Sequence, residues 1–288
     1  MASPKRILIT GGTDGIGREA VLQFVDQGHE VTVAGRSQLK ADDLIDICLD
    51  KYSKKIRFIQ VDLSSMSQTR AFAEKVANEK FDIYIMNAGI MNPEKTQTED
   101  GLEMTMMTNI ISTYIIVDTV LKQRTDQKIH FVFVTSVLMK YYSATPLGQR
   151  IFNPKKVENW QKSMVPGEKS GPGKYAISKI GQATLASIVN GLNLNGVTAT
   201  SVHPGCVMTN MMNNLPTRQQ FYLRLAKPFI TSKFDAGANV VKAALFPLPS
   251  NMYYLASKEA KLPSIIQSAK TIDAFSTFFQ QQYSTSSQ

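Results

Sequence analysis

The sequence predicts an α/β protein built on one doubly wound parallel sheet with helices on both faces. Short apolar runs of strand length alternate with helical patterns, which is typical of a parallel sheet. The first run, Ile7-Leu8-Ile9, leads into a glycine-rich turn and then a helical pattern. A later run ends in the hydroxyl pair Thr135-Ser136, at the strand end where an open parallel sheet binds its ligands. We expect a single domain over residues 1–288.

Seven apolar runs are expected to form the strands. They lie at residues 6–10, 30–34, 56–60, 81–86, 129–135, 198–202 and 252–255. Residues 137–174 break the alternation with several prolines and glycines, which mark turns. We interpret this segment as an insertion that walls a substrate site.

The first turn has the composition of a dinucleotide-binding loop. Residues 10–17 read Thr-Gly-Gly-Thr-Asp-Gly-Ile-Gly, between a strand and a helix. Glycines let the backbone approach a pyrophosphate, and the helix N-terminus supplies free N–H groups and partial positive charge. An ordinary tight turn is the alternative.

The end of the second strand indicates which dinucleotide is bound. A domain that binds NAD usually has an acidic residue here, which holds the ribose 2′-hydroxyl. This chain has Gly35-Arg36-Ser37 instead. A guanidinium pairs well with a 2′-phosphate, so the sequence favours NADP(H). The alternative is that Arg36 is an ordinary solvated surface arginine.

The catalytic candidates are Tyr175 and Lys179, which are four residues apart and share one face of a helix. A nearby cation favours a phenolate, so we expect Lys179 to lower the pKa of Tyr175 from its ordinary value of about 10. Tyr175 would then exchange a proton with substrate near neutral pH. A Tyr-x-x-x-Lys pattern alone also arises by chance.

Together these residues resemble the short-chain dehydrogenase/reductase family of classical type. The resemblance covers roughly residues 5–263 and implies a Rossmann-type fold. Residues 100–103, Asp-Gly-Leu-Glu, and the tail residues 252–254 resemble the retinol dehydrogenase and WW-domain oxidoreductase branch. Met86 and Ser112 depart from the family pattern and weaken this subfamily assignment.

The resemblance assigns roles to individual positions. The implied catalytic residues are Asn109, Ser136, Tyr175 and Lys179. The implied cofactor-binding residues are Gly11, Thr13, Asp14, Gly15, Ile16, Gly17, Arg36, Ser37, Asp62, Leu63, Asn87, Ala88, Gly89, Tyr175, Lys179, Pro204, Gly205, Val207 and Thr209. In this reading Ser136 positions a carbonyl, Tyr175 donates the proton, Lys179 assists it and binds ribose, and Asn109 holds a water.

These roles predict an NADP(H)-dependent oxidoreductase that interconverts a hydrophobic alcohol and its ketone or aldehyde. Two alternatives remain: an enzyme of the same fold with other chemistry, such as a double-bond reductase or epimerase, and a non-catalytic NADP(H)-sensing protein. A pure interaction scaffold would not need the glycine turn and the catalytic residues together.

An apolar, methionine-rich stretch follows within residues 206–235, which we interpret as a substrate lid. Met208, Met211, Met212 and Phe221 are the candidate substrate contacts, because methionine adapts to irregular shapes. A helix packed on the core is the alternative.

Composition narrows the function classes. The net charge of +9 is dispersed without a run of like charges, so we expect no nucleic-acid partner. Cys48 and Cys206 lack metal-ligand spacing, His203 has no second ligand, and we expect no metal. The first strand starts near residue 6 and no long apolar run was found, so we expect a cytoplasmic protein without a transmembrane segment. The resemblance leaves open a homodimer or homotetramer.

Overall fold

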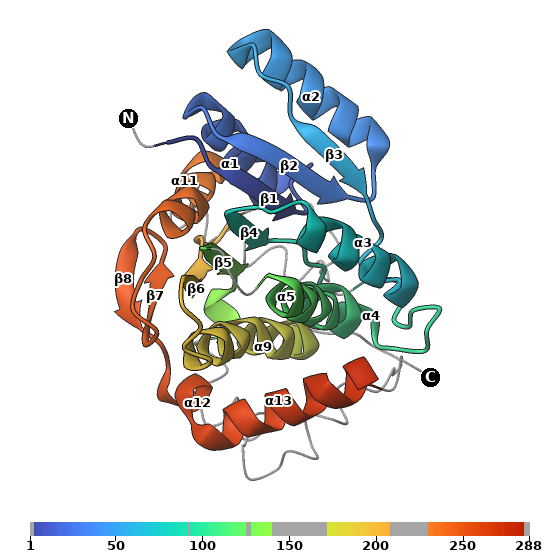
Figure 1. Cartoon of the computed structure of the whole chain (residues 1–288), viewed down its shortest axis with the longest axis vertical. Coiled ribbons are helices and arrows are strands. Elements are labelled where there is room, and N and C mark those ends of the chain that lie inside the picture. Colours follow the sequence, from blue (N-terminus) through green and yellow to red (C-terminus); the bar gives the residue numbers. More distant parts are fainter. Residues whose placement is uncertain (1–2, 92, 125–127, 140–171, 208–229, 285–288) are drawn as a thin grey trace.

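The computed structural model describes residues 3–91, 93–124, 128–139, 172–207 and 230–284. Its centre is one sheet with the strand order β3-β2-β1-β4-β5-β6-β7-β8 (Figure 1). The strands are β1 (Arg6–Thr10), β2 (Glu30–Gly35), β3 (Arg57–Gln60), β4 (Ile83–Met86), β5 (Ile129–Val134), β6 (Val197–His203), β7 (Met252–Leu255) and β8 (Lys258–Lys261).

Helices lie between these strands in the chain. They are α1 (Gly15–Asp26), α2 (Gln38–Tyr52), α3 (Met66–Asn78), α4 (Met104–Met106), the π-helical turn η1 (Met107–Ile111), α5 (Ser112–Gln123), α9 (Pro172–Gly191), α11 (Lys233–Leu245), α12 (Ser264–Gln267) and α13 (Ala269–Ser284).

The doubly wound parallel sheet predicted from the sequence is confirmed. Seven strands run parallel, and all seven predicted runs form strands with ends within two residues of expectation. Strands form there because helices on both faces of the sheet bury these short apolar runs. In β5, for example, every residue is buried. At one edge a further strand, β8, which the sequence did not predict, pairs antiparallel with β7.

The two faces of the sheet carry separate apolar cores. Phe24 of α1, Leu44 of α2 and Val240 of α11 belong to one core. Phe72 of α3 and Ile116 of α5 belong to the other, with much of α9. Helices therefore cover both faces, as the sequence predicts (Figure 1).

The direction of winding reverses at β1. This strand pairs in parallel with β2 on one side and with β4 on the other. Connections therefore leave β1 and β4 toward opposite sides, and a crevice opens beyond their carboxyl ends. This arrangement places the glycine turn after β1 and the segment after β4 at one ligand-binding edge.

The helix α13 covers the outer side of α5 and α9 (Figure 1). Phe279 stacks on Tyr114 of α5, with ring centroids 4.6 Å apart. Phe275 packs against Gly181 of α9 so closely that a Cβ at Gly181 would lie 2.9 Å from its ring. The helix α13 therefore packs against both long helical stretches, the one that carries Asn109 and the one that carries Tyr175.

Among the described residues, one helical stretch has the length and apolarity of a membrane span. It runs from Met104 to Gln123, and 72% of its most apolar window is buried inside the fold. A core helix shows the same composition.

Candidate active site

A cleft of about 1450 Å³ opens at the carboxyl ends of the strands. The sequence-predicted residues that line it are Gly11, Thr13, Asp14, Gly15, Ile16, Gly17, Arg36, Ser37, Asp62, Leu63, Asn87, Ala88, Gly89, Ser136, Tyr175, Lys179, Pro204, Gly205 and Val207. The fold therefore brings together residues that are spread over most of the chain.

The glycine turn is shaped for close backbone contact. Gly11 and Gly15 have positive φ, 65° and 55°, which L side chains rarely adopt. A Cβ at Gly17 would lie 2.4 Å from the carbonyl oxygen of Gly11, so no larger residue fits. Asp14 caps α1 by accepting a hydrogen bond from the Gly15 N–H. The turn forms a cradle that fits a dinucleotide pyrophosphate at a helix N-terminus.

Asn87 ties this turn to the end of β4. Its Nδ2 donates to the carbonyl oxygens of Thr10 at 2.9 Å and Gly11 at 3.0 Å. The Thr10 hydroxyl in turn accepts from the backbone N–H groups of Asn87 and Ala88, both at 3.1 Å. The Nδ2 group of Asn87 thus holds the glycine turn in shape.

The opposite end of the cleft is exposed and basic. Arg36 is exposed directly after β2, and the Ser37 hydroxyl caps α2 by accepting from the Lys40 N–H at 3.3 Å. A phosphate beside Arg36 would therefore also meet the N-terminus of α2. Asp62 lies nearby, and its Oδ1 accepts from the Ser64 N–H at 2.9 Å.

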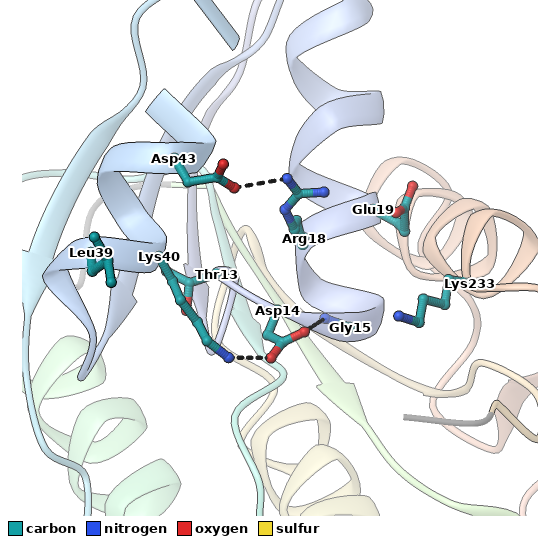
Figure 2. A pocket seen from close by; sticks show the side chains of 9 residues that line it. All are labelled: Thr13, Asp14, Gly15, Arg18, Glu19, Leu39, Lys40, Asp43 and Lys233. Atoms are coloured by element: carbon teal, nitrogen blue, oxygen red, sulfur yellow. Dashed lines mark hydrogen bonds and ion pairs between the residues drawn. The ribbon is translucent and has the colours of Figure 1, made fainter. Parts of the chain in front are cut away.

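A second hollow, of about 390 Å³, lies between α1 and α2 behind the glycine turn (Figure 2). Ion pairs bridge it, one between Lys40 and Asp14 and one between Arg18 and Asp43 at 3.0 Å. Lys40 reaches from α2 toward the start of α1 and lines both the hollow and the main cleft. The long side chain of Lys40 adds a second positive charge to the basic end, next to Arg36.

Ser136 and Tyr175 meet at the inner end of the cleft. Ser136 follows β5, and Tyr175 lies on the first turns of α9. Their side chains are hydrogen-bonded to each other. A carbonyl oxygen placed between the two hydroxyls would receive two donors. These are the two residues that the sequence predicts as the proton donor and its partner.

Lys179 lies beneath Tyr175 and is almost completely buried. Its Nζ donates to the Val134 carbonyl oxygen at 2.7 Å and to Oε1 of Gln182 at 2.9 Å. The same atom is 5.6 Å from the centroid of the Tyr175 ring. Two of the three ammonium donors are thus held by the protein, which leaves one for the cleft.

The expected direction of the Tyr175 pKa is wrong for the protein alone. Burial raises the pKa of Tyr175 to about 12, and the hydrogen bond with Ser136 opposes this rise. Burial likewise lowers the pKa of Lys179 to about 7. Both groups sit in a desolvated site that disfavours their charged forms, an effect larger than the attraction between ammonium and phenolate.

Asn109 lies behind the cleft wall, in the π-helical turn η1. Its amide clamps the segment after β4: Oδ1 accepts from the Ile90 N–H at 2.8 Å, and Nδ2 donates to the Ile90 carbonyl at 3.0 Å. Nδ2 also donates to the Ser178 hydroxyl at 3.0 Å. Asn109 therefore joins three segments of the site.

The segment after β6 is fixed from the neighbouring helix α11. Asn239 donates to the Pro204 carbonyl oxygen at 2.9 Å. Gly205 has φ of 114°, and a Cβ there would lie 2.2 Å from the hydroxyl of Thr231. This tight packing presents Pro204, Gly205 and Val207 to the cleft.

Some predicted site residues lie outside the described residues. They are Thr209 and the candidate substrate contacts Met208, Met211, Met212 and Phe221. Most of the 137–174 insertion and of the 206–235 lid segment lies there too. These assignments stay predictions.

The sequence motif at residues 100–103 has a structural role. Asp100 accepts from the Met66 N–H at 2.8 Å and so caps α3. Glu103 caps α4 by accepting from the Met106 N–H at 2.7 Å. Within the described part of the chain, no group of three His, Cys, Asp or Glu side chains is placed to hold a metal.

Sequence reasoning missed two residues of this site. Lys40 escaped notice because a lysine on an exposed helix turn has no distinguishing pattern. Gln182 has no motif of its own, although its position three residues after Lys179 places it on the same helix face.

The comparisons with known proteins agree with this geometry. The family described as short chain dehydrogenase matches residues 5–146. Short-chain dehydrogenase chyC of Penicillium rubens is 31% identical over 207 residues, which is 72% of each chain. The chain belongs to the short-chain dehydrogenase family.

Two further relatives are more distant. A WW domain-containing oxidoreductase of Gallus gallus is 28% identical over 253 residues, 84% of this chain but only 58% of the relative's length. Retinol dehydrogenase 12 of Mus musculus is 26% identical over 287 residues, 93% of this chain and 83% of the relative.

A solved structure shares the fold. It is a short-chain dehydrogenase from Sphingobium yanoikuyae in complex with NADPH, with a TM-score of 0.62 and 20% identity; the match covers 84% of each chain. The sequence relatives, not this structure, make the chain an oxidoreductase of the short-chain dehydrogenase family.

Proposed function

We propose that this protein is an NADP(H)-dependent oxidoreductase that interconverts a hydrophobic alcohol and its ketone or aldehyde. One observation carries the proposal: the Ser136–Tyr175 hydrogen bond and the buried Lys179 lie in the same cleft as the glycine cradle and Arg36. A dinucleotide that extends from the basic end along the cradle would end beside the two hydroxyls.

The residues fit this cofactor at both ends. Gly11, Gly15 and Gly17 leave the backbone open to a pyrophosphate. Arg36, with Lys40 and the N-terminus of α2, would hold a 2′-phosphate by charge-assisted hydrogen bonds. That the Sphingobium yanoikuyae protein was solved with NADPH supports the same choice here.

The cofactor supplies the hydride that adds to a carbonyl carbon, and the protein manages the proton and the geometry. Ser136 would donate a hydrogen bond to the carbonyl oxygen and orient it. Tyr175 would give its proton to that oxygen, which becomes the alcohol hydroxyl. Lys179 would direct its remaining N–H toward the nicotinamide ribose and stabilise the phenolate left on Tyr175.

The neutral form of Tyr175 suits this role in the reduction direction. Because burial holds the pKa of Tyr175 near 12, its proton is present at neutral pH. The negative charge appears only as the proton leaves, beside the Lys179 ammonium. Stabilisation is then larger in the transition state than in the ground state, as catalysis requires.

A panel of carbonyl compounds with NADPH, followed by NADPH absorbance, tests the proposal. The panel should pair short and long members of aliphatic aldehydes, aromatic ketones and steroid-like ketones. We expect consumption of NADPH with at least one hydrophobic carbonyl and formation of the alcohol. If tight NADPH binding is found without turnover of any compound, the sensor alternative holds.

The same panel separates the other chemistry on this fold. Deuteride from labelled NADPH should appear on the carbon that bears the new hydroxyl. Deuterium on a former double bond would indicate a double-bond reductase. Product epimerised without net consumption of NADPH would indicate an epimerase.

We also propose that the 206–235 segment forms a lid over the substrate. If Met208, Met211, Met212 and Phe221 contact substrate, polar substitutions there should raise KM for long substrates and spare short ones. Each lost apolar contact should cost about 1–3 kcal/mol of binding free energy. If these residues are core instead, the same substitutions should lower Tm and affect all substrates alike.

The oligomeric state remains a prediction, and α13 bears on it. The faces of α5 and α9 that carry Tyr114 and Gly181 are covered by Phe279 and Phe275. We therefore propose that any homodimer or homotetramer either includes α13 in its interface or uses another surface. Sedimentation of the whole chain, alone and with Phe279→Asp, measures this directly.

A further inference from the structure

Gln182 lies between two residues of the catalytic set. It sits on α9, one turn after Lys179, and its side chain is fully buried. Oε1 accepts from the Lys179 Nζ at 2.9 Å, and Nε2 donates to the Asn109 carbonyl oxygen at 2.8 Å. One amide thus joins the catalytic lysine to the backbone of η1.

The chemistry of the neighbours fixes the orientation of this amide. An ammonium can only donate and a backbone carbonyl can only accept. The oxygen of Gln182 must therefore face Lys179, and its nitrogen must face Asn109. Neither contact survives if the amide is turned over, so the side chain has one preferred pose.

The Asn109 carbonyl is filled by protein donors. The Thr113 hydroxyl donates to it at 2.9 Å in addition to Gln182. A carbonyl oxygen has two lone pairs, so both are occupied. The Gln182 side chain therefore joins the Asn109 carbonyl oxygen to the Lys179 ammonium.

We propose that Gln182 is a positioning residue that holds the Lys179 ammonium charged and aimed into the cleft. This inference rests on the proposed function, because it assigns Lys179 its catalytic role. With Val134 and Gln182 taking two of its donors, one N–H of Lys179 is left for the cleft, which both Lys179 and Tyr175 line. Removing the Oε1 acceptor would let the ammonium change its orientation. It would also destabilise the charged form of Lys179 relative to the neutral amine.

The other groups described around Nζ are uncharged, apart from Tyr175 when it ionises. They are the Val134 carbonyl of β5 and Gly89, whose Cβ position would lie 3.3 Å from Nζ and 3.3 Å from Oδ1 of Asn109. Burial lowers the pKa of Lys179. A hydrogen bond to a charged group is among the stronger ones, so we expect the Gln182 acceptor to oppose this lowering.

The test follows the titration of Lys179 directly, by NMR of the cofactor-free chain with ¹³Cε-labelled lysine. The Lys179→Met variant assigns the signal. Gln182→Met keeps length and burial but removes the acceptor. Thr184→Val is the matched control: Thr184 is buried on the same helix, and its hydroxyl has no hydrogen-bond partner among the described residues. We expect Gln182→Met to lower the pKa of Lys179 by about one to two pH units.

Gln182→Glu guards against a Met variant that does not fold. Its carboxyl keeps an oxygen for the ammonium, whether ionised or protonated, so the pKa of Lys179 should equal or exceed that of the unmodified protein. An unchanged Lys179 titration in Gln182→Met, or a lowered one in Gln182→Glu, overturns the proposal. Because no substrate or NADPH is present, this result stands apart from whether the carbonyl panel shows turnover.

A second readout uses activity once a substrate is found. The alkaline limb of kcat/KM against pH should move to lower pH in Gln182→Met by the same amount as the NMR titration. It should stay in place in Thr184→Val. A uniform loss at every pH with an unmoved limb would mean that Gln182 is only part of the packing.

Discussion

The two ends of the cleft hold their cations in opposite ways. At the basic end, Arg36 directly after β2 and Lys40 in the first turn of α2 are exposed, and Lys40 is ion-paired with Asp14. At the catalytic end, Lys179 is 3% exposed and hydrogen-bonded to Val134 and Gln182. The basic end presents positive charge to a ligand. At the catalytic end, burial disfavours the charged form of Lys179.

The difference explains where function can change cheaply. An exposed arginine contributes little to stability, and replacing it alters mainly which phosphate is recognised. A buried lysine is coupled to its hydrogen-bond partners, so replacing one partner changes the position and protonation of the lysine. We therefore expect cofactor choice and catalysis to respond to different substitutions.

The largest effect is expected at the catalytic end. Tyr175→Phe removes the proton donor and leaves the basic end untouched. Turnover should fall by about 10²–10⁴-fold, while the Kd of NADPH, measured by fluorescence titration, stays nearly unchanged. Retention of more than about a tenth of the rate would contradict the assignment of Tyr175, and an equal loss of NADPH binding would contradict the separation of the two ends.

Cofactor choice should respond at the other end. Arg36→Ala with Gly35→Asp removes the guanidinium and adds a carboxylate that accepts from a ribose 2′-hydroxyl. A Cβ at Gly35 would meet Thr13 at 3.6 Å, an ordinary contact, so the backbone need not shift. Preference for NADPH should fall by about 10–100-fold in the ratio of kcat/KM values. Equal use of NADH and NADPH by the unmodified protein would show that Arg36 does not select the cofactor.

Stability against pH should distinguish the two cations. The pKa of Lys179 is about 7 in the folded chain and 10.5 as the ordinary value. Between these values the unfolded chain binds more protons, so the free energy of unfolding should rise with pH by about 1.4 kcal/mol per pH unit. Tyr175, whose pKa is raised from 10.0 to about 12, reverses the trend only above its ordinary value.

The measurement is urea denaturation of the cofactor-free chain from about pH 7 to pH 9.5. The difference between the unmodified protein and Lys179→Met isolates the contribution of Lys179. The same difference for Arg36→Ala should be flat, because Arg36 is exposed and its removal uncovers no buried group. Parallel curves for the unmodified protein and Lys179→Met would mean that Lys179 is not desolvated.

Most of the sheet could be predicted because burial leaves a pattern in the sequence. Parallel strands covered on both faces are short apolar runs, and glycine turns mark where they end. The strand β8 reads Lys-Glu-Ala-Lys and has no such pattern. It is an edge strand, exposed on one side, where charged residues are common because they discourage further pairing.

Some features of the site could likewise be predicted from the sequence and others could not. The positions of Tyr175 and Lys179 follow from helix periodicity, and Arg36 follows from strand order. The direction of the Tyr175 pKa does not, since it depends on burial contributed by segments far apart in the chain. The role of Gln182 depends on η1, whose π-helical turn no local pattern in the sequence announces.

The smallest expected effect is the response of NADPH binding to salt. Exposed charges are screened within about 8–10 Å at physiological ionic strength, and buried ones are not. Raising NaCl from low to moderate concentration should weaken NADPH binding by about two- to fivefold, the range of exposed ion pairs. Arg36→Ala should lose most of this sensitivity and Lys179→Met should keep it. NADH, which lacks the 2′-phosphate, serves as the control ligand. Equal salt dependence in the two variants would mean that the cleft does not separate an exposed phosphate-binding end from a desolvated catalytic end.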